Sequence, residues 1–335
     1  MDFTELIDLA AERLGGAVLY ANDEFFAPKE NLLKASAPVF IEGKYTDLGK
    51  WMDGWESRRR RTPGFDWCII RLGLPGIIRG VVVDTAHFKG NFPESCSIEA
   101  CAIDGTPDIE QLTGSGVEWT EILPPSQLQG DSQNLFHVQG IERFTHLRFK
   151  IYPDGGVARL RVYGEVVPDP KRLRREGREL DLAAVENGAL VVSSSDMFFG
   201  HRHNLIMPGR ALDMSDGWET RRRRGPGHDW VVIRLGASGT IRRIEVDTSH
   251  FKGNFPESCS LEACDAAGVV VADTTIPTLP WKEVLPRTRL QAHTRHFFEE
   301  ELKDVGTATH VRFNIFPDGG ISRLRVYGQL DEDEA

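Results

Sequence analysis

The sequence predicts an all-β protein made of two tandem jelly-roll β-sandwich repeats, with short helices at the repeat starts. Three observations indicate this fold. Long motifs occur twice, short β-type segments are separated by turn residues, and the periodicity of long helices is missing beyond the termini. Many strands at turn-punctuated spacing in about 150 residues are typical of a sandwich or a jelly roll.

The duplication involves whole domains. Segment 53–67, DGWESRRRRTPGFDW, returns 163 residues later as DGWETRRRRGPGHDW, and segment 84–101 returns at 247–264. Because solenoid units run roughly 20–50 residues, this period indicates two domains rather than a solenoid. We place the repeats at 1–164 and 179–330, with a charged linker at 165–178 and an acidic tail at 331–335. The first repeat carries about ten extra residues between Asn31 and Asp53.

The first repeat begins with the acidic, amphipathic segment MDFTELIDLAAERLGG. This pattern predicts a short helix, and it lacks the basic and then apolar order of a signal peptide. The strands follow. Segments 67–72 and 230–235 are apolar and β-branched, segments 77–85 and 241–248 alternate, and segments 97–102 and 260–263 continue the pattern.

Each repeat ends with two alternating segments around a Pro-Asp-Gly-Gly turn. In the first repeat these segments are THLRFKIYP and VARLRVYG, and the second repeat has the same arrangement. Strict alternation on both sides of a turn of this composition predicts a β-hairpin.

Composition excludes several classes of protein. The net charge is -10, so a nucleic-acid partner is not expected despite the arginine runs. No apolar stretch approaches the length of a membrane span, so no membrane partner is expected. Four of the five cysteines are repeat pairs and Cys68 has no twin, because Val231 stands at its counterpart position. This argues against a disulfide scaffold and for a cytoplasmic location.

The duplicated segment DT-x-HFKGNFPES concentrates chemically active side chains in one loop. Histidine and glutamate can exchange protons, and lysine and asparagine can bind a carboxylate or a ureido carbonyl. The candidate catalytic residues are His87, Glu94, His250 and Glu257, and the candidate binding residues are Lys89, Asn91, Lys252 and Asn254. The alternative is a tight structural loop whose Asn and Asp side chains bond the backbone.

The run of four arginines provides a second candidate site. On an extended segment alternate residues face the same side, so Arg58 and Arg60 share a face, as do Arg221 and Arg223. Arginine binds carboxylates with two parallel hydrogen bonds, which predicts an anion clamp. The alternative is a solvated basic strand paired with acidic residues.

The sequence does not require a cofactor. Cys96 and Cys101 are five residues apart on a predicted strand and therefore point to opposite faces, so they cannot share a zinc ion. A divalent metal held by His87, Glu94 and Glu99, or by their counterparts, stays an open alternative.

These motifs resemble the allantoicase family. The resemblance rests on DGWE-x-RRRR-x-PG-x-DW, DT-x-HFKGNFPESCS-x-EAC and the FPDGG-x-x-RLRVYG segment, each present twice, and it covers nearly the whole chain. It implies two jelly-roll repeats similar to galactose-binding and discoidin-type domains. Tyr152 is a mild departure, since the second copy has Phe316 before its PDGG turn.

The resemblance also implies an activity. Allantoicases convert allantoate and water to ureidoglycolate and urea in purine (allantoin) degradation, so that the nitrogen can be used. Allantoate is then the small-molecule partner, and we expect a homo-oligomer. The alternative is a non-catalytic module that binds a carbohydrate or a small anion. A third hypothesis assigns catalysis to one repeat only, because the copies differ at Phe65 and His228 and at Thr62 and Gly225.

Overall fold

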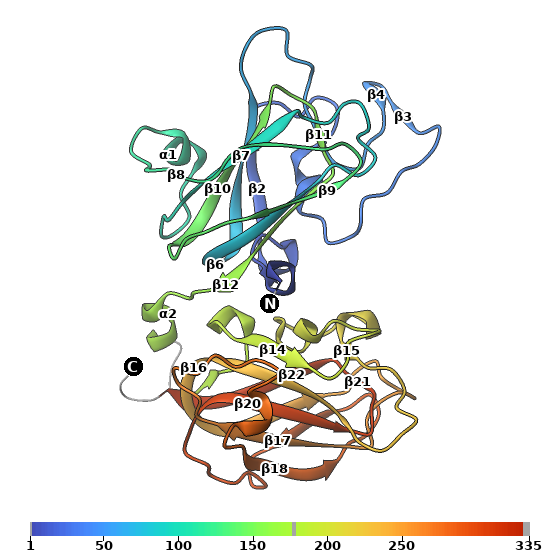
Figure 1. The fold of residues 1–335 in the computed structure, drawn as a ribbon, viewed down its shortest axis with the longest axis vertical. Coiled ribbons are helices and arrows are strands. Elements are labelled where there is room, and N and C mark those ends of the chain that lie inside the picture. The colour runs from blue at the N-terminus through green and yellow to red at the C-terminus, as the bar shows by residue number, and fades with distance from the viewer. Residues whose placement is uncertain (1, 176–178, 331–335) are drawn as a thin grey trace. The chain divides into compact units, whose positions relative to one another are not determined.

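The computed structural model describes residues 2–175 and 179–330, and it divides into two compact units, Met1–Val167 and Pro168–Ala335 (Figure 1). Unit one contains η1 Phe3–Glu5, β1 Ile7–Asp8, η2 Glu12–Leu14, β2 Ala17–Ala21, η3 Lys29–Leu33, β3 Tyr45–Thr46, β4 Gly49–Lys50, β5 Trp55–Glu56, β6 Asp66–Asp84, β7 Ser95–Cys101, α1 Ile109–Thr113, β8 Thr120–Gln127, β9 Gln133–His137, β10 Arg143–Tyr152, β11 Gly156–Val157 and β12 Arg159–Val166.

Unit two repeats this strand order, except that its described residues have η6 in place of β3 and β4. It contains α2 Pro170–Arg175, β13 Leu180–Asp181, η4 Val185–Asn187, β14 Leu190–Ser194, η5 Arg202–Ile206, η6 Met214–Asp216, β15 Trp218–Glu219, β16 Asp229–Asp247, β17 Ser258–Cys264, η7 Ile276–Thr278, β18 Lys282–Arg289, β19 Arg295–Phe298, β20 Thr307–Phe316, β21 Gly320–Ile321 and β22 Arg323–Leu330. The helices at the repeat starts are short 3-10 turns, and no helix among the described residues is long and apolar enough to cross a membrane.

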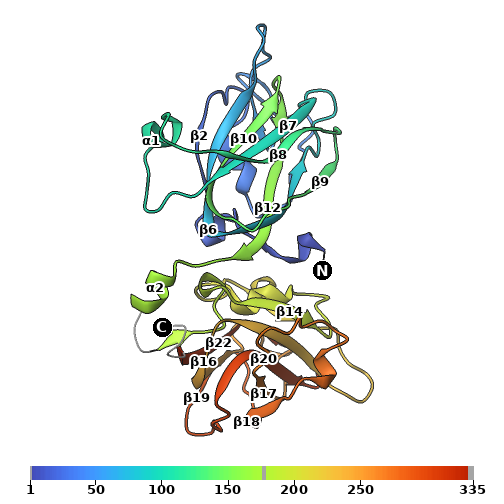
Figure 2. The same cartoon turned by 60° about the vertical axis from the view of Figure 1, so that its left-hand side comes forward.

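A single 19-residue strand, β6, organises unit one. Its residues 66–71 pair with β2 and β10, and its residues 80–84 pair with β12 and β9. The strand therefore contributes to both layers of the sandwich, in the order β1-β12-β6-β10-β7-β8 (Figure 2). Where the pairing changes, a Cβ at Gly73 would lie 2.7 Å from the backbone of Leu14 and Gly16, so the close approach requires glycine.

Unit two has the equivalent order β13-β22-β16-β20-β17-β18, with β16 in the role of β6. The predicted all-β class and the two tandem jelly-roll repeats are thus confirmed. Segments 67–72 and 77–85, which the sequence suggests are separate strands, join into β6. Alternation and apolar character both continue across the layer change, which explains why the two halves look like separate strands.

The predicted terminal hairpin is wrong. β10 pairs with β6 and β7, whereas β12 pairs with β6 and β1, so the two strands around the PDGG turn lie in different layers. The turn instead packs against the loop between β6 and β7. A Cβ at Gly155, whose φ is 135°, would lie 2.8 Å from the carbonyl oxygen of Asn91, and the N–H of Gly156 donates to that same oxygen.

Each unit has its own core. Trp55 is fully buried, packs 6.2 Å from the ring of Phe149, and donates its indole N–H to the carbonyl of Asp23. The five cysteines are free and buried, and burial raises the pKa of Cys96 to about 12. These thiols are therefore packing residues rather than nucleophiles.

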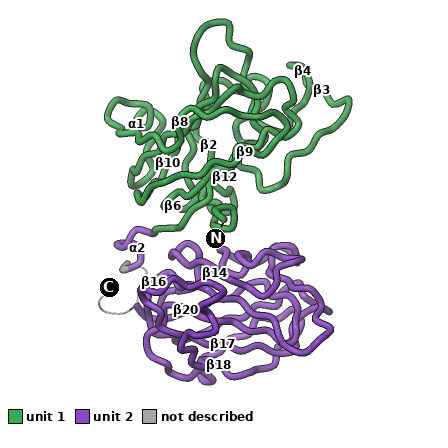
Figure 3. Tube along the Cα trace, viewed as in Figure 1, with its two compact units in different colours: residues 1–167 green, residues 168–335 purple. Residues whose placement is uncertain are grey.

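The junction between the units differs in detail from the linker expected at 165–178. Strand β12 runs on to Val166, and the following residues form α2 (Figure 3). The expected acidic tail at 331–335 lies outside the described residues.

Candidate active site

The loop between β6 and β7 holds His87 in an unusual backbone conformation. Its φ is 69°, in the left-handed region, and its N–H donates to Asp131 Oδ1 at 2.7 Å. Thr85 donates its hydroxyl to the carbonyl of Gln129 at 2.5 Å, which ties the loop to the segment before β9. The loop is therefore rigid, and the position of His87 is determined by the fold.

The imidazole of His87 is oriented by one backbone contact. Nε2 lies 3.3 Å from the carbonyl oxygen of Pro38. A carbonyl oxygen can only accept, so this contact assigns the proton of the neutral ring to Nε2. Nδ1 then carries the lone pair and can act as a base.

A cavity of about 520 Å³ opens beside this loop. It is lined by Phe26, Phe40, Lys50, Met52, Glu56, His87, Lys89, Gly90 and Asn91. Three of the predicted site residues, His87, Lys89 and Asn91, therefore meet at one cavity. Its size suits a small polar molecule, and its walls combine acidic, basic, amide and apolar groups.

Glu56 is the cavity residue that sequence reasoning missed. Asn91 donates from Nδ2 to Glu56 Oε1 at 2.7 Å. Burial raises the pKa of the Glu56 carboxyl above its ordinary value, and the bond from Asn91 opposes this only in part. The carboxyl thus keeps its proton to higher pH than a free glutamate. Its presence in both copies of the DGWE motif was the available signal.

The ten extra residues of the first repeat build another wall of the cavity. They include the short hairpin β3–β4, which lies on the side of unit one away from α1 (Figure 1). This segment supplies Phe40, Lys50 and Met52. Lys50 Nζ lies 4.5 Å from the centroid of the Phe40 ring, and that ring lies 5.8 Å from the ring of His87.

The predicted arginines of unit one lie outside its cavity, whereas Arg223 lines the cavity of unit two. Arg58 Nε donates to Asp23 Oδ2 at 2.7 Å, and Arg60 Nη1 donates to Asp66 Oδ1 at 2.6 Å. In unit two, Arg221 and Arg223 make the same pairs with Asp196 and Asp229. Neither Arg58 nor Arg60 lines the cavity with His87. These ion pairs hold the arginine segment to the sandwich.

The two glutamates proposed for a metal site are also separated from His87. Glu94 is exposed and does not line the cavity, while Glu99 forms ion pairs with Arg148 and Lys150 on the neighbouring strand β10. Within residues 2–175 and 179–330, no three His, Cys, Asp or Glu side chains group as metal ligands.

Unit two repeats the loop, and its cavity keeps the counterparts of Phe26, Glu56 and Asn91 but not of His87. His250 has a φ of 70°, its Nε2 lies 3.0 Å from the carbonyl of Ala211, and its N–H donates to His293 Nδ1 at 2.7 Å. Asn254 again donates to Glu219.

The cavity of unit two has a different wall. It measures about 920 Å³ and is lined by Phe199, Glu219, Thr220, Arg222, Arg223, Gly253, Asn254, Phe255, Glu257, Arg289, Leu290, Pro317, Asp318 and Gly319. His250 and Lys252 are not among these described lining residues. Glu257 forms ion pairs with Arg287 and Arg289. The unit-two cavity therefore gathers Arg223, Asn254 and Glu257 of the predicted residues, without the histidine and the lysine of the loop.

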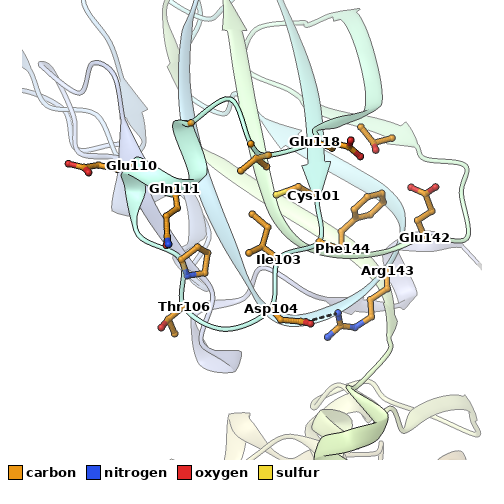
Figure 4. A pocket seen from close by; sticks show the side chains of 16 residues that line it. Cys101, Ile103, Asp104, Thr106, Glu110, Gln111, Glu118, Glu142, Arg143 and Phe144 are labelled. Atoms are coloured by element: carbon orange, nitrogen blue, oxygen red, sulfur yellow. Dashed lines mark ion pairs between the residues drawn. The ribbon is translucent and has the colours of Figure 1, made fainter.

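Another hollow of unit one, about 1210 Å³, lies at the other end of β7. Figure 4 shows Asp104 and Arg143 pointing toward each other there, 3.9 Å apart, among further acidic side chains. Glu110, Glu118 and Glu142 also line this hollow. It contains neither histidine nor lysine and has an excess of carboxylates, so it is unsuited to an anionic substrate.

The fold and the cavity together define a tandem β-sandwich protein with a small polar cavity beside the loop that carries His87. The allantoicase repeat model matches residues 7–167 and 180–331. The chain therefore belongs to the allantoicase family.

Individual relatives agree with this assignment over nearly their whole length. The chain is 51% identical over 332 residues to "Probable allantoicase" of Ralstonia nicotianae, covering 98% of this chain and 97% of that protein. It is 49% identical to the allantoicase of Dictyostelium discoideum, covering 99% and 89%. The crystal structure of allantoicase from Saccharomyces cerevisiae superposes with a TM-score of 0.77 at 39% identity, covering 96% and 92%.

Proposed function

We propose that this protein hydrolyses allantoate to ureidoglycolate and urea in purine degradation, and that the cavity of unit one is the active site. Full-length similarity to allantoicases supports the activity. The observation that carries the site is the convergence of His87, Asn91 and Glu56 with two lysines at one cavity. Allantoate has one carboxylate and two ureido groups on a single carbon, so it needs a cation, amide contacts and proton transfer.

Glu56 is the proposed general acid. Release of urea breaks the bond between the central carbon and one ureido nitrogen, and that nitrogen must gain a proton. A carboxyl whose pKa is raised by burial is protonated over a wider pH range and can deliver this proton. Asn91 donates from Nδ2 to one oxygen of the Glu56 carboxyl. Its Oδ1 is an acceptor, so in this proposal it binds a ureido N–H of the substrate.

His87 is the proposed base. Its Nδ1 removes a proton from water, and the resulting hydroxyl forms the new C–O bond of ureidoglycolate. The remaining ureido nitrogen can assist by forming an imine that is then hydrated, and direct displacement by water is the alternative route. In both routes one water is consumed, and solvent returns the proton from His87 to Glu56.

The other predicted residues take supporting roles in this proposal. Lys89 lies at the cavity with its ammonium 3.7 Å from Asp131 Oδ2, and it contributes positive charge near the substrate. Arg58 and Arg60 hold the backbone that leads from Glu56 to β6, through their pairs with Asp23 and Asp66. The divalent metal stays a hypothesis that the assay below addresses.

The test is urea release from allantoate by the purified protein, with ureidoglycolate identified as the second product. Urea release with both products in equal amounts supports the proposal. Loss of activity after chelator treatment, with rescue by one divalent ion, would add a metal to the mechanism. Binding of allantoate without turnover under any metal condition would favour the alternative binding module.

Two expectations about the cellular form stay predictions. We propose a cytoplasmic location, supported by five buried thiols without a disulfide. We also propose a homo-oligomer, which light scattering of the purified chain tests directly.

A further inference from the structure

The β3–β4 segment, residues 39–52, is anchored to unit one by a buried ion pair. Arg159 Nη2 donates to Asp53 Oδ2 at 2.7 Å, and the same oxygen accepts the N–H of Val39 at 3.1 Å. At its other face, Phe26 packs under the hairpin, since a Cβ at Gly49 would lie 3.8 Å from the Phe26 ring. The segment is therefore held at both ends and leans over the cavity that contains His87.

Unit two has the same anchor without the hairpin. Arg323 Nη2 donates to Asp216 Oδ2 at 2.8 Å, and that oxygen accepts the N–H of Leu212. In unit one, residues 39–52 lead up to the anchoring aspartate, Asp53. In unit two, the four residues 212–215 lead up to its counterpart, Asp216. Phe199, the counterpart of Phe26, is consequently 62% exposed. The hairpin is an addition to an otherwise shared scaffold.

Lys50 stands out among the residues that the hairpin supplies. It lines the cavity, and its ammonium lies over the face of Phe40. In the part of the chain that the structure describes, no carboxylate lies within 4.0 Å of its Nζ, so its charge is available to a ligand. Both lysines are exposed, but the ammonium of Lys89 lies 3.7 Å from the carboxylate of Asp131.

We propose that Lys50 binds the carboxylate of the substrate. Because Lys50 comes from the β3–β4 hairpin, unit one is then the repeat that binds an anionic diureide. This inference rests on the proposed function. With the carboxylate at Lys50, the ureido groups extend toward Asn91, Glu56 and His87, which line the same cavity.

The experiment combines one substitution with a change in the ligand. Lys50→Gln removes the charge, and Lys44→Gln is the matched control, because Lys44 lies on the same segment over the Trp51 ring and does not line the cavity. The ligands are allantoate and N,N′-methylenediurea, which is allantoate without its carboxylate. KM is measured for allantoate, and the inhibition constant is measured for methylenediurea.

Lys50→Gln should raise the KM for allantoate about tenfold, as expected for loss of a charge-assisted hydrogen bond. The inhibition constant of methylenediurea should stay unchanged, and Lys44→Gln should alter neither quantity. An unchanged KM in Lys50→Gln overturns the inference, and so does an equal weakening of both ligands, which would indicate a general distortion of the cavity.

Failure of the proposed function is distinguishable from failure of this inference. If the wild-type chain does not turn over allantoate, calorimetric binding of allantoate to wild type and Lys50→Gln replaces KM, and the same ratio decides. A second variant replaces residues 39–52 with residues 212–215 of unit two. With circular dichroism confirming the fold, this variant should lose allantoate binding altogether, and retained binding would place the carboxylate site elsewhere.

Discussion

His87 and His250 occupy loops of the same backbone shape, with φ values of 69° and 70°. His87 lines the described cavity of unit one with Lys89 and Asn91, whereas His250 is not among the residues that line the described cavity of unit two. The difference arises outside the loop. Unit one has the hairpin over its cavity, and unit two has a short connection that leaves Phe199 exposed. The comparison teaches that identical motifs do not guarantee equivalent sites. What the loop can bind also depends on the segment that lies against it, which is the β3–β4 hairpin in unit one and a short connection in unit two.

The largest effect should come from the carboxyl beneath Asn91. Glu56→Gln removes the proposed acid and should lower kcat by about a hundredfold or more, while Glu219→Gln should leave kcat nearly unchanged. Steady-state rates of urea release from both variants measure this directly. Equal losses in the two variants would mean that both repeats catalyse, and the proposed asymmetry would be wrong.

The buried anchors should behave alike in stability and differently in activity. Arg159→Met and Arg323→Met each remove a buried guanidinium from its aspartate, Asp53 or Asp216, and each should cost about 3–5 kcal/mol of unfolding free energy in its own unit. Denaturant unfolding with hydrogen exchange to locate the weakened unit measures the cost. Only Arg159→Met should also impair turnover, because it releases Val39 and the hairpin. Loss of activity in Arg323→Met alone would contradict the comparison.

The pH dependence should identify Glu56. Burial raises the pKa of Glu56, and only the protonated carboxyl can donate a proton to the leaving nitrogen. As the pH rises through this pKa the carboxyl loses its proton, so kcat should fall. The hydrogen bond from Asn91 favours the charged carboxylate, so Asn91→Ala should raise the pKa further and move the alkaline limb to higher pH. If the alkaline limb of the pH profile stays in place or moves to lower pH in Asn91→Ala, a group other than Glu56 determines that limb.

The smallest effect should come from the one cysteine without a twin. Cys68 is fully buried at the position where unit two has Val231, so the scaffold accepts both side chains. Cys68→Val should change the unfolding free energy by less than about 1.5 kcal/mol and leave activity intact. A large loss of stability, seen as a lower melting temperature, would reveal a packing difference between the two cores.

The sequence was sufficient for the repeats and the fold class, because these depend on local patterns present twice. It was insufficient for strand pairing. Alternation in 146–152 and 157–164 shows that both are strands, but it does not say that each pairs with β6 instead of the other. Pairing depends on which layer receives each strand, and that is decided by the packing of the PDGG turn on the loop at Asn91.

Side-chain partners were equally hidden. The arginine run looked like an anion clamp, but Asp23 and Asp66, which are 35 and 6 residues away in sequence, already neutralise Arg58 and Arg60. The pairing of Glu56 with Asn91 joins residues 35 positions apart, so neither motif alone reveals it. A motif shows which chemistry is present, whereas only the fold shows which groups are already occupied.

The strand β6 has a consequence for how each unit opens. Since one continuous backbone belongs to both layers, separating the layers requires breaking that backbone's ladders on both sides at once. The two layers of such a unit cannot separate independently, so partial opening is confined to the edge strands and to the hairpin. New chain ends introduced near Gly73 would divide β6 between the two layers, so circular permutants cut there should lose cooperative unfolding. Permutants cut in the exposed loops should keep it.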